Sequence, residues 1–416
     1  MSGSLGMRAT LDGMPGTLPD GEPMPVDGAL PEHALAAVGA QGFGVYVHVP
    51  FCASRCGYCD FNTYTPQEGV VSDGYVDLVL AELKLAAGIL DGAAPRVGTV
   101  FVGGGTPTLL RPAELGRILD GIDATWGLAS DAEITTEANP ESVNAAALRD
   151  LRAAGFTRIS LGMQSVAPGV LAVLDRRHSP RRAAAAAMEA RAAGFAHVNL
   201  DLIYGTPGET PEDFAASLAA ALDAGVDHVS AYALIIEDGT RLAARMRRGE
   251  LPYPDDDVAA DRYLTADAAL NAAGFDWYEV SNWARGTSAA CRHNELYWTG
   301  GDWWGLGPGA HSHVGGVRWW NVKHPTAYGA RLAAAASPGQ GREILTAAQR
   351  HVEDVLLRIR LATGMPLVAL DAAGLAGARV ALDDGLLDPS AFHRGRAVLT
   401  LSGRLLADAV ARALLA

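Results

Sequence analysis

Three of the four cysteines lie close together in the sequence, at Cys52, Cys56 and Cys59. Thiolates are soft ligands for iron, and this Cys-x3-Cys-x2-Cys spacing predicts one tight loop that binds three irons of a 4Fe-4S cluster and leaves the fourth iron without a protein ligand. A zinc site with His48 or Asp60 as the fourth ligand is the alternative, although structural zinc usually draws on two separated ligand pairs. Inert buried thiols are the third interpretation.

A run of glycines, Gly103-Gly104-Gly105, precedes Thr106 and Pro107. Glycine allows the backbone to approach a ligand closely, so this loop is a candidate binding element. It does not match the Gly-x-Gly-x-x-Gly fingerprint of dinucleotide sites, because Pro107 breaks the pattern. A plain tight turn is the alternative.

Regular elements must position these two loops. From Gly44 onward, short β-branched runs alternate with Ala- and Leu-rich helical stretches, which is typical of a parallel sheet covered by crossover helices. The sequence therefore predicts an α/β fold with a partial, TIM-like (β/α)6 barrel, in which the loops that follow the strands share one face. The six predicted strands cover residues 45–49, 99–102, 133–136, 158–162, 197–203 and 228–234.

Composition divides the chain into four predicted segments. The first is rich in Pro and Gly with little periodicity, which predicts a disordered tail. The barrel follows it, then an aromatic-rich extension, and then a Leu- and Ala-rich, mostly helical or winged-helix-like C-terminal domain. In order, these segments cover residues 1–40, 41–250, 251–335 and 336–416.

The bulk properties exclude several classes of protein. With 47 acidic and 33 basic residues the net charge is -14, and no dense Lys/Arg stripe is present, so we do not expect nucleic acid as a partner. No apolar run approaches the ~18 residues of a membrane span. The N-terminal segment lacks the basic and apolar regions of a signal peptide, and we therefore expect the protein in the reducing cytoplasm.

Together, the cysteine and glycine loops resemble the radical S-adenosylmethionine (SAM) superfamily, and more closely its subgroup of oxygen-independent coproporphyrinogen III oxidases and HemW-type haem chaperones. The resemblance extends from about residue 45 to residue 312, with a matching C-terminal domain. It implies that the open iron of the cluster chelates SAM, whose reductive cleavage releases a deoxyadenosyl radical. By the same resemblance, the positions around SAM are Tyr46, Gly104, Gly105, Thr106, Glu137, Gln164, Arg176, Asp201 and Ala233.

The chemistry of these residues agrees with the resemblance. SAM carries a sulfonium, an ammonium, a carboxylate and a ribose diol, which require nearby carboxylates, a cation and hydrogen-bonding side chains. Glu137 and Asp201 supply acceptors, and Arg176 supplies the cation. For each residue taken alone, a solvated charge or a helix cap is the alternative.

A second motif lies at residues 293–298, His-Asn-Glu-Leu-Tyr-Trp, and matches the His-Asn-x-x-Tyr-Trp element of haem-binding HemW-type proteins. Seven of the eight tryptophans gather around it, together with His311 and His313. Haem is a wide apolar disc with two carboxylates, which needs aromatic surface and an imidazole. We expect His293 as the candidate haem ligand, with Cys291 beside it as a candidate thiolate; a domain-interface core is the alternative.

The resemblance also separates two activities. The oxidases carry a further cysteine two residues after the third, whereas Phe61 stands here. We therefore expect a haem chaperone that transfers haem to acceptor proteins, with coproporphyrinogen III oxidase of porphyrin biosynthesis as the alternative and a radical SAM enzyme of another substrate as the third. Whether the chain is itself an enzyme stays open. The expected partners include an electron donor such as a flavodoxin or ferredoxin, while a homodimer and peripheral membrane contact stay open.

Overall fold

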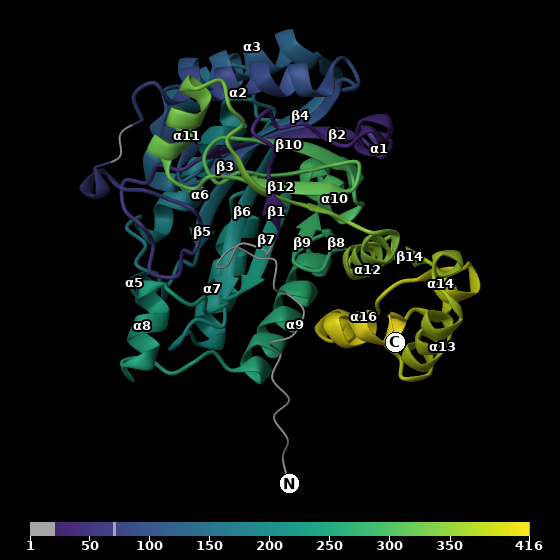
Figure 1. The fold of residues 1–416 in the computed structure, drawn as a ribbon. Helices are drawn as coiled ribbons and strands as arrows, with labels where there is room; N and C mark the ends of the chain where they lie inside the picture. The colour runs from purple at the N-terminus through teal and green to yellow at the C-terminus, as the bar shows by residue number, and fades with distance from the viewer. Residues whose placement is uncertain (1–20, 70–71, 416) are drawn as a thin grey trace.

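The computed structural model describes residues 21–69 and 72–415 (Figure 1). Six parallel strands, each followed by at least one helix, lie side by side in chain order, which confirms the predicted partial barrel. Most of their residues are buried, because helices and loops cover both faces of the sheet. The strands are β2 (Phe43–Val49), β3 (Val97–Gly104), β4 (Leu128–Ala138), β5 (Arg158–Gln164), β6 (His197–Tyr204) and β7 (His228–Ala233).

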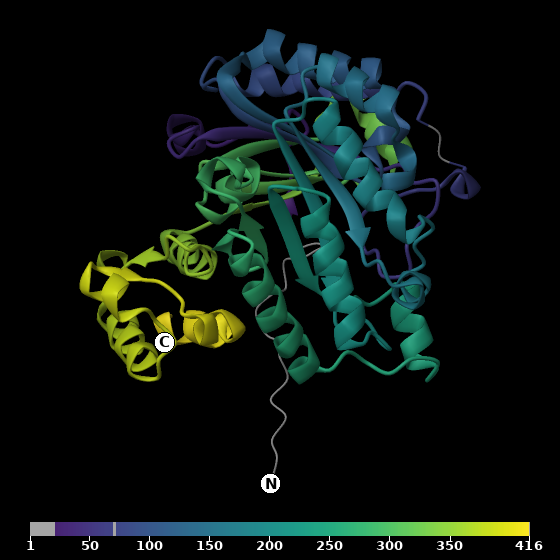
Figure 2. The same ribbon diagram turned by 180° about the vertical axis from the view of Figure 1, so that it is seen from behind.

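Helices cover the outer face of these strands (Figure 2). Several begin with proline in the first turn, where the missing N–H costs no hydrogen bond; one of them is also capped by Thr210, whose Oγ1 accepts the N–H of Asp213 at 3.1 Å. No helix among the described residues is both long and apolar enough to cross a membrane. The helices are α2 (Tyr75–Leu90), α3 (Pro112–Trp126), α4 (Ala145–Ala153), α5 (Pro168–Val173), α6 (Pro180–Ala192), α7 (Pro211–Asp223), α8 (Arg241–Arg247) and α9 (Asp256–Ala272).

The aromatic-rich extension continues the barrel sheet. Its strand β10 (Asp302–Leu306) pairs in parallel with β2, with Trp304 opposite Val45. The predicted segment 251–335 therefore shares one sheet with the barrel, which continues through backbone hydrogen bonds on both sides of the six strands. The added elements are β8 (Asp276–Glu279), β9 (Asn282–Ala284), α10 (Arg292–Trp298), β11 (His311–Val314), β12 (Val317–Asn321), α11 (Pro325–Ala333) and β13 (Gly339–Ile344).

Part of the predicted disordered tail is ordered. Strand β1 (Glu22–Pro23) pairs with β13, and α1 (Glu32–Ala37) follows it. Met24 and Leu30 are buried in the main core. The prediction of disorder is wrong for residues 21–40, because these contacts come from strands some 300 residues away that composition does not reveal; residues 1–20 lie outside the described residues.

The C-terminal domain has a core of its own, which includes Val355, Met365 and Val410. It begins after β13, later than the predicted residue 336, because β13 still belongs to the barrel sheet. Figure 1 shows it beside α9 and below α10. Its elements are α12 (Ala347–Arg358), β14 (Met365–Pro366), α13 (Ala372–Asp383), α14 (Pro389–His393), β15 (Arg396–Ala397), α15 (Leu401–Leu405) and α16 (Ala407–Leu414).

A buried carboxyl group joins α2 to the added strands. Glu82 accepts hydrogen bonds from the N–H of Gly307 at 2.8 Å, from Asn321 Nδ2 at 2.7 Å and from the hydroxyl of Tyr328 at 2.5 Å. Burial raises the pKa of Glu82 from 4.5 to about 7 despite these three donors. The folded protein therefore holds a proton on this group at pH values at which the unfolded chain has released it.

This proton predicts a pH dependence of stability. Between about pH 4.5 and pH 7 the native state binds the proton and the unfolded state does not, so the contribution of Glu82 to the free energy of unfolding falls as pH rises through this window. We expect Glu82→Gln, whose side chain stays neutral, to lose that part of the slope. Urea midpoints of both proteins from pH 4 to 8 measure it; parallel curves across the window would contradict the prediction.

Candidate functional site

The cysteine loop lies at the carboxyl ends of the parallel strands, directly after β2. Backbone hydrogen bonds fold it on itself, from Cys52 N–H to Tyr64 O at 2.9 Å and from Tyr64 N–H to Pro50 O at 2.6 Å. Gly57 bridges two neighbouring segments, because its N–H donates to Leu174 O at 3.1 Å and its carbonyl accepts from the N–H of Leu242 at 2.8 Å. The loop is thus held from both sides at the face where barrel proteins place their sites.

The thiols of Cys52 and Cys56 each lie close to a polar side chain from another loop. The hydroxyl of Thr106 approaches Cys52 Sγ at 3.8 Å, and Arg176 Nη1 approaches Cys56 Sγ at 3.4 Å. Burial raises the pKa of the Cys59 thiol to about 12 and also raises that of Cys52. Donors aimed at sulfur fit an electron-rich thiolate cluster, and a bound metal is what keeps such buried thiols deprotonated.

His48, the histidine of the alternative zinc site, is engaged elsewhere in this structure. His48 Nε2 faces the carbonyl oxygen of Asn62 at 2.9 Å, and its Nδ1 faces the hydroxyl of Tyr46 at 3.0 Å. Both ring nitrogens are therefore engaged, and neither is free to join the cysteines. Within the described ranges, no three side chains of His, Cys, Asp or Glu converge as ligands of a single ion.

The glycine loop interlocks with the cysteine loop. Gly105 N–H donates to Val49 O at 2.8 Å, and Thr106 N–H donates to Phe51 O at 2.7 Å. Gly104 has a φ of +107°, and a Cβ at Gly105 would lie 2.6 Å from the carbonyl oxygen of Phe51. Only glycine fits this crossing, because a side chain would force the two loops apart.

Two carboxyl groups lie beneath the glycine loop. Glu137 Oε2 accepts the N–H of Gly104 at 3.0 Å. Burial, and then the charge of Asp201, raise the pKa of Glu137 to about 8. Asp201 accepts hydrogen bonds from Ser160 Oγ at 2.9 Å and from Asn199 Nδ2 at 2.7 Å. Two carboxylates in one buried place fit a cationic ligand, since a nearby positive charge would offset their desolvation.

Gln164 is the last residue of β5, and Arg176 contacts the same end of this strand. Arg176 donates from Nη2 to Gly162 O at 2.7 Å and from Nη1 to Asn139 Oδ1 at 2.8 Å. Its Nε is buried without a hydrogen-bond partner in the described part of the chain. Gln164 has a φ of +62°, where the pairing of β5 with β6 also shifts register. Such strain in a non-glycine residue is typical of binding sites, where the surroundings enforce it.

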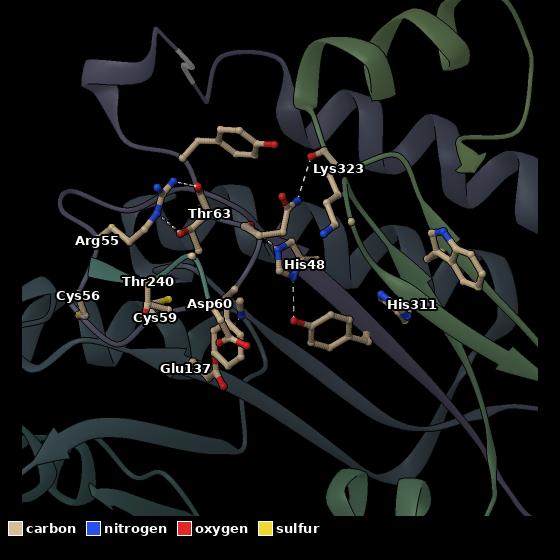
Figure 3. Close-up of a pocket in the computed structure, with 18 of the residues that line it drawn as sticks. His48, Arg55, Cys56, Cys59, Asp60, Thr63, Glu137, Thr240, His311 and Lys323 are labelled. Carbon is tan, nitrogen blue, oxygen red and sulfur yellow. Dashed lines mark hydrogen bonds between the residues drawn. The ribbon is translucent and has the colours of Figure 1, made fainter. Parts of the chain in front are cut away.

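A cavity of about 1530 Å³ opens beside these residues (Figure 3). It brings together part of the predicted set, namely Tyr46, Cys56, Cys59, Gly104, Glu137 and Arg176. The other predicted residues do not line it: Cys52, Gly105, Thr106, Gln164, Asp201, Ala233 and His293. Cys52, Gly105 and Thr106 nevertheless contact the lining loops, and Asp201 lies within electrostatic range of Glu137.

The cavity extends from the cysteine loop to an aromatic half, which we define by Trp298, Trp303, His311, Trp320 and Lys323. A further wall comes from the C-terminal domain, through Leu356, Leu357 and Arg360. In the sequence, the cluster of tryptophans already indicates the aromatic half of the cavity. The sequence gives no signal for this wall, because Leu356 and Leu357 on an amphipathic helix, with Arg360 just beyond its end, are equally typical of an ordinary core.

His293, the predicted haem ligand, does not line the cavity. His293 is 1% exposed, and its Nδ1 and Nε2 lie 2.8 Å from the hydroxyl oxygens of Thr99 and Tyr297, respectively. Burial lowers its pKa to about 3. Cys291 is likewise buried, with its Sγ 3.5 Å from Glu133 Oε1. Within the motif at 293–298, Tyr297 and Trp298 line the cavity, while His293 lies behind Tyr297.

Comparisons with known proteins agree with this geometry. The family model of the radical SAM superfamily matches residues 46–221. The heme chaperone HemW of Mycobacterium tuberculosis is 60% identical over 92% of this chain and 97% of its own length. HemW of Escherichia coli is 39% identical over 65% of this chain and 70% of its own length.

Among solved structures, the Escherichia coli coproporphyrinogen III oxidase HemN, described as a radical SAM enzyme, matches with a TM-score of 0.78 and 25% identity. The match covers 92% of each chain, so the barrel, the extension and the C-terminal domain share one architecture. Identity over nearly the full length is far higher to HemW than to HemN. This chain therefore belongs to the HemW family of radical SAM proteins.

Proposed function

We propose that the protein is a haem chaperone, which binds haem and transfers it to acceptor proteins in the cytoplasm. The observation that carries the proposal is the cavity, in which an aromatic half that includes the imidazole of His311 adjoins the cysteine loop. A porphyrin requires this combination of flat apolar surface, imidazole and cationic groups. The names of the relatives, which are heme chaperones, support the same function.

In this proposal the cysteine loop holds a 4Fe-4S cluster on Cys52, Cys56 and Cys59, and SAM lies against the glycine loop. With SAM on its open iron, such a cluster supplies one-electron chemistry. Glu137 and Asp201 would favour the cationic groups of SAM, and Arg176 would hold its carboxylate. Tyr46, Gly104, Gly105, Thr106, Gln164 and Ala233 complete the proposed surroundings of SAM.

The second candidate function is the oxidative decarboxylation of coproporphyrinogen III, which the structural match to HemN favours. Against it stands the cysteine loop itself, in which Phe61 takes the place of the further cysteine of the oxidases. Phe61 is 51% exposed and lines the cavity, so it provides apolar surface where an oxidase would provide a thiol.

The proposed partners follow from the chaperone function. Haem and haem-acceptor proteins are the first, and an electron donor such as a flavodoxin or ferredoxin is needed if SAM is cleaved. The proposal also includes association as a homodimer. It includes peripheral contact with a membrane, through which the protein would reach membrane-bound acceptors.

A transfer assay tests the proposed function. We expect the protein with reconstituted cluster to bind haemin stoichiometrically and to pass it to apomyoglobin, visible as the myoglobin absorption spectrum. A parallel anaerobic reaction with reduced cluster, SAM and coproporphyrinogen III is expected to yield no protoporphyrinogen. Formation of protoporphyrinogen with methionine and deoxyadenosine, or failure to bind haemin, would overturn the chaperone proposal.

A further inference from the structure

The four imidazoles in and behind the cavity differ in what their ring nitrogens contact. Both nitrogens of His48 and both of His293 face hydrogen-bond partners within 3.0 Å. His313 Nδ1 lies 3.0 Å from the carbonyl oxygen of Gly301. The ring of His311, which lines the cavity, has no hydrogen-bond partner in the described residues, whereas each of the other three rings has at least one.

The position of His311 suits a neutral ligand. The side chain extends from β11 and stacks on Trp320, with ring centroids 6.1 Å apart and planes inclined by 30°. Burial, and then the charges of His48, Lys323 and Arg318, lower its pKa to about 4. The imidazole is therefore neutral near pH 7, and the lone pair that binds a metal is available.

A cation lies on the same side of the cavity. Figure 3 shows His311 and Lys323 on one side of His48, with Cys56 and Cys59 on the other. The ammonium group of Lys323 has no ion-pair partner within the described residues, whereas the nearby Arg318 is paired with Glu343 and Glu353. An unpaired cation in a cavity of aromatic surface is suited to a carboxylate of the ligand.

The cavity has room for a ligand in addition to SAM. Pockets for single small ligands measure about 300–1,000 Å³, and this cavity measures about 1530 Å³. The aromatic half adds Trp298 and Trp303 to the surface around His311. A flat apolar molecule with a central metal and peripheral carboxylates matches these three features together.

We propose that haem binds in the aromatic half with its iron on the imidazole of His311 and a propionate near Lys323. The inference rests on the proposed function and replaces His293 as the iron ligand. It also explains the position of the C-terminal domain, since Leu356 and Leu357 then form a wall of the haem site. Haem would leave toward an acceptor only when this wall or the iron ligand releases it.

Titration with haemin, followed by absorption in the Soret region, tests the inference. We expect His311→Ala to shift the Soret maximum and to weaken binding by about tenfold or more, which corresponds to about 1.4 kcal/mol. Added imidazole should restore the wild-type spectrum of this variant. Lys323→Gln should weaken binding without moving the maximum, because it removes a carboxylate partner and leaves the iron ligand in place.

His293→Gln is the matched control, because glutamine retains hydrogen-bonding groups at a buried position away from the cavity; it is expected to keep the wild-type maximum. Circular dichroism establishes that each variant is folded. An unchanged spectrum and affinity in His311→Ala, or a shifted maximum in His293→Gln alone, would overturn the inference while haem binding by the wild type still stands. Failure of the wild type to bind haemin would overturn the proposed function and this inference with it.

Discussion

Replacing Cys56 with serine is expected to remove the iron–sulfur cluster. A 4Fe-4S cluster contributes about four irons per chain, and serine offers a harder and more basic oxygen in place of the soft thiolate that iron–sulfur chemistry requires. Cys56 lines the cavity beside Arg176, so its loss also removes the sulfur toward which that guanidinium points. Iron and sulfide analysis after anaerobic reconstitution, with the visible absorption of the cluster, measures the effect.

The fourth cysteine provides the matched control. Cys291 is buried against Glu133 behind the cavity, and Cys291→Ser should retain the iron, the sulfide and the absorption of the wild type. A full iron content in Cys56→Ser would contradict the assignment of the loop. Stoichiometric zinc in oxygen-protected wild-type protein would contradict it more broadly, because the cysteines would then form a different centre.

The second large effect concerns the contact between the C-terminal domain and the barrel. Arg404 of α15 forms a bidentate ion pair with Asp267 of α9, at 2.7 and 3.0 Å, and both side chains are only 5% exposed. The guanidinium also lies 4.5 Å from the ring centroid of Trp277, and Trp283 Nε1 donates to Asp267 at 3.0 Å. This buried cluster connects the C-terminal domain to α9 of the barrel.

Arg404→Ala is expected to lower the free energy of unfolding by about 3–5 kcal/mol, because it leaves the carboxylate of Asp267 buried without its cation. Urea denaturation measures the loss, and limited proteolysis should cut the C-terminal domain faster in the variant. The control is Arg117→Ala, which breaks an exposed pair with Asp77 and should cost at most about 1 kcal/mol. Equal losses in the two variants would contradict a special role of the buried pair.

This contact bears on function as well as on stability. The C-terminal domain supplies Leu356, Leu357 and Arg360 to the cavity. Loss of the Arg404 contact would therefore loosen one wall of the proposed haem site while leaving the cysteine loop intact. Cluster content and haem affinity should accordingly respond differently to Cys56→Ser and Arg404→Ala.

The barrel could be predicted from the sequence because its signals are local. Each of the six predicted strands lies within or overlaps an observed strand, since β-branched runs followed by turn residues and an apolar helical pattern determine the order of elements. The cysteine spacing is local too, and it points to one loop at one strand end. The glycine loop carries a positive φ at Gly104 and a close backbone approach at Gly105, both of which glycine indicates directly.

Other features depend on contacts between distant segments. The pairing of β10 with β2 joins residues about 260 positions apart, and the pairing of β1 with β13 joins the first and the last strand of this sheet in chain order. Composition gives no information about such partners, so the sequence predicts disorder for 21–40 and does not reveal that the extension at 251–335 joins the barrel sheet. Hydrogen bonding between strands decided both.

The sequence alone is enough to predict metal-binding chemistry for this protein, because three thiols within one short loop have few structural uses other than holding a metal centre. The tertiary structure decided which histidine reaches the cavity. His293 carries the more recognisable motif, but packing buries it and engages both of its nitrogens, whereas the strand β11 turns His311 into the cavity. Burial and orientation depend on the whole fold, and no local pattern encodes them.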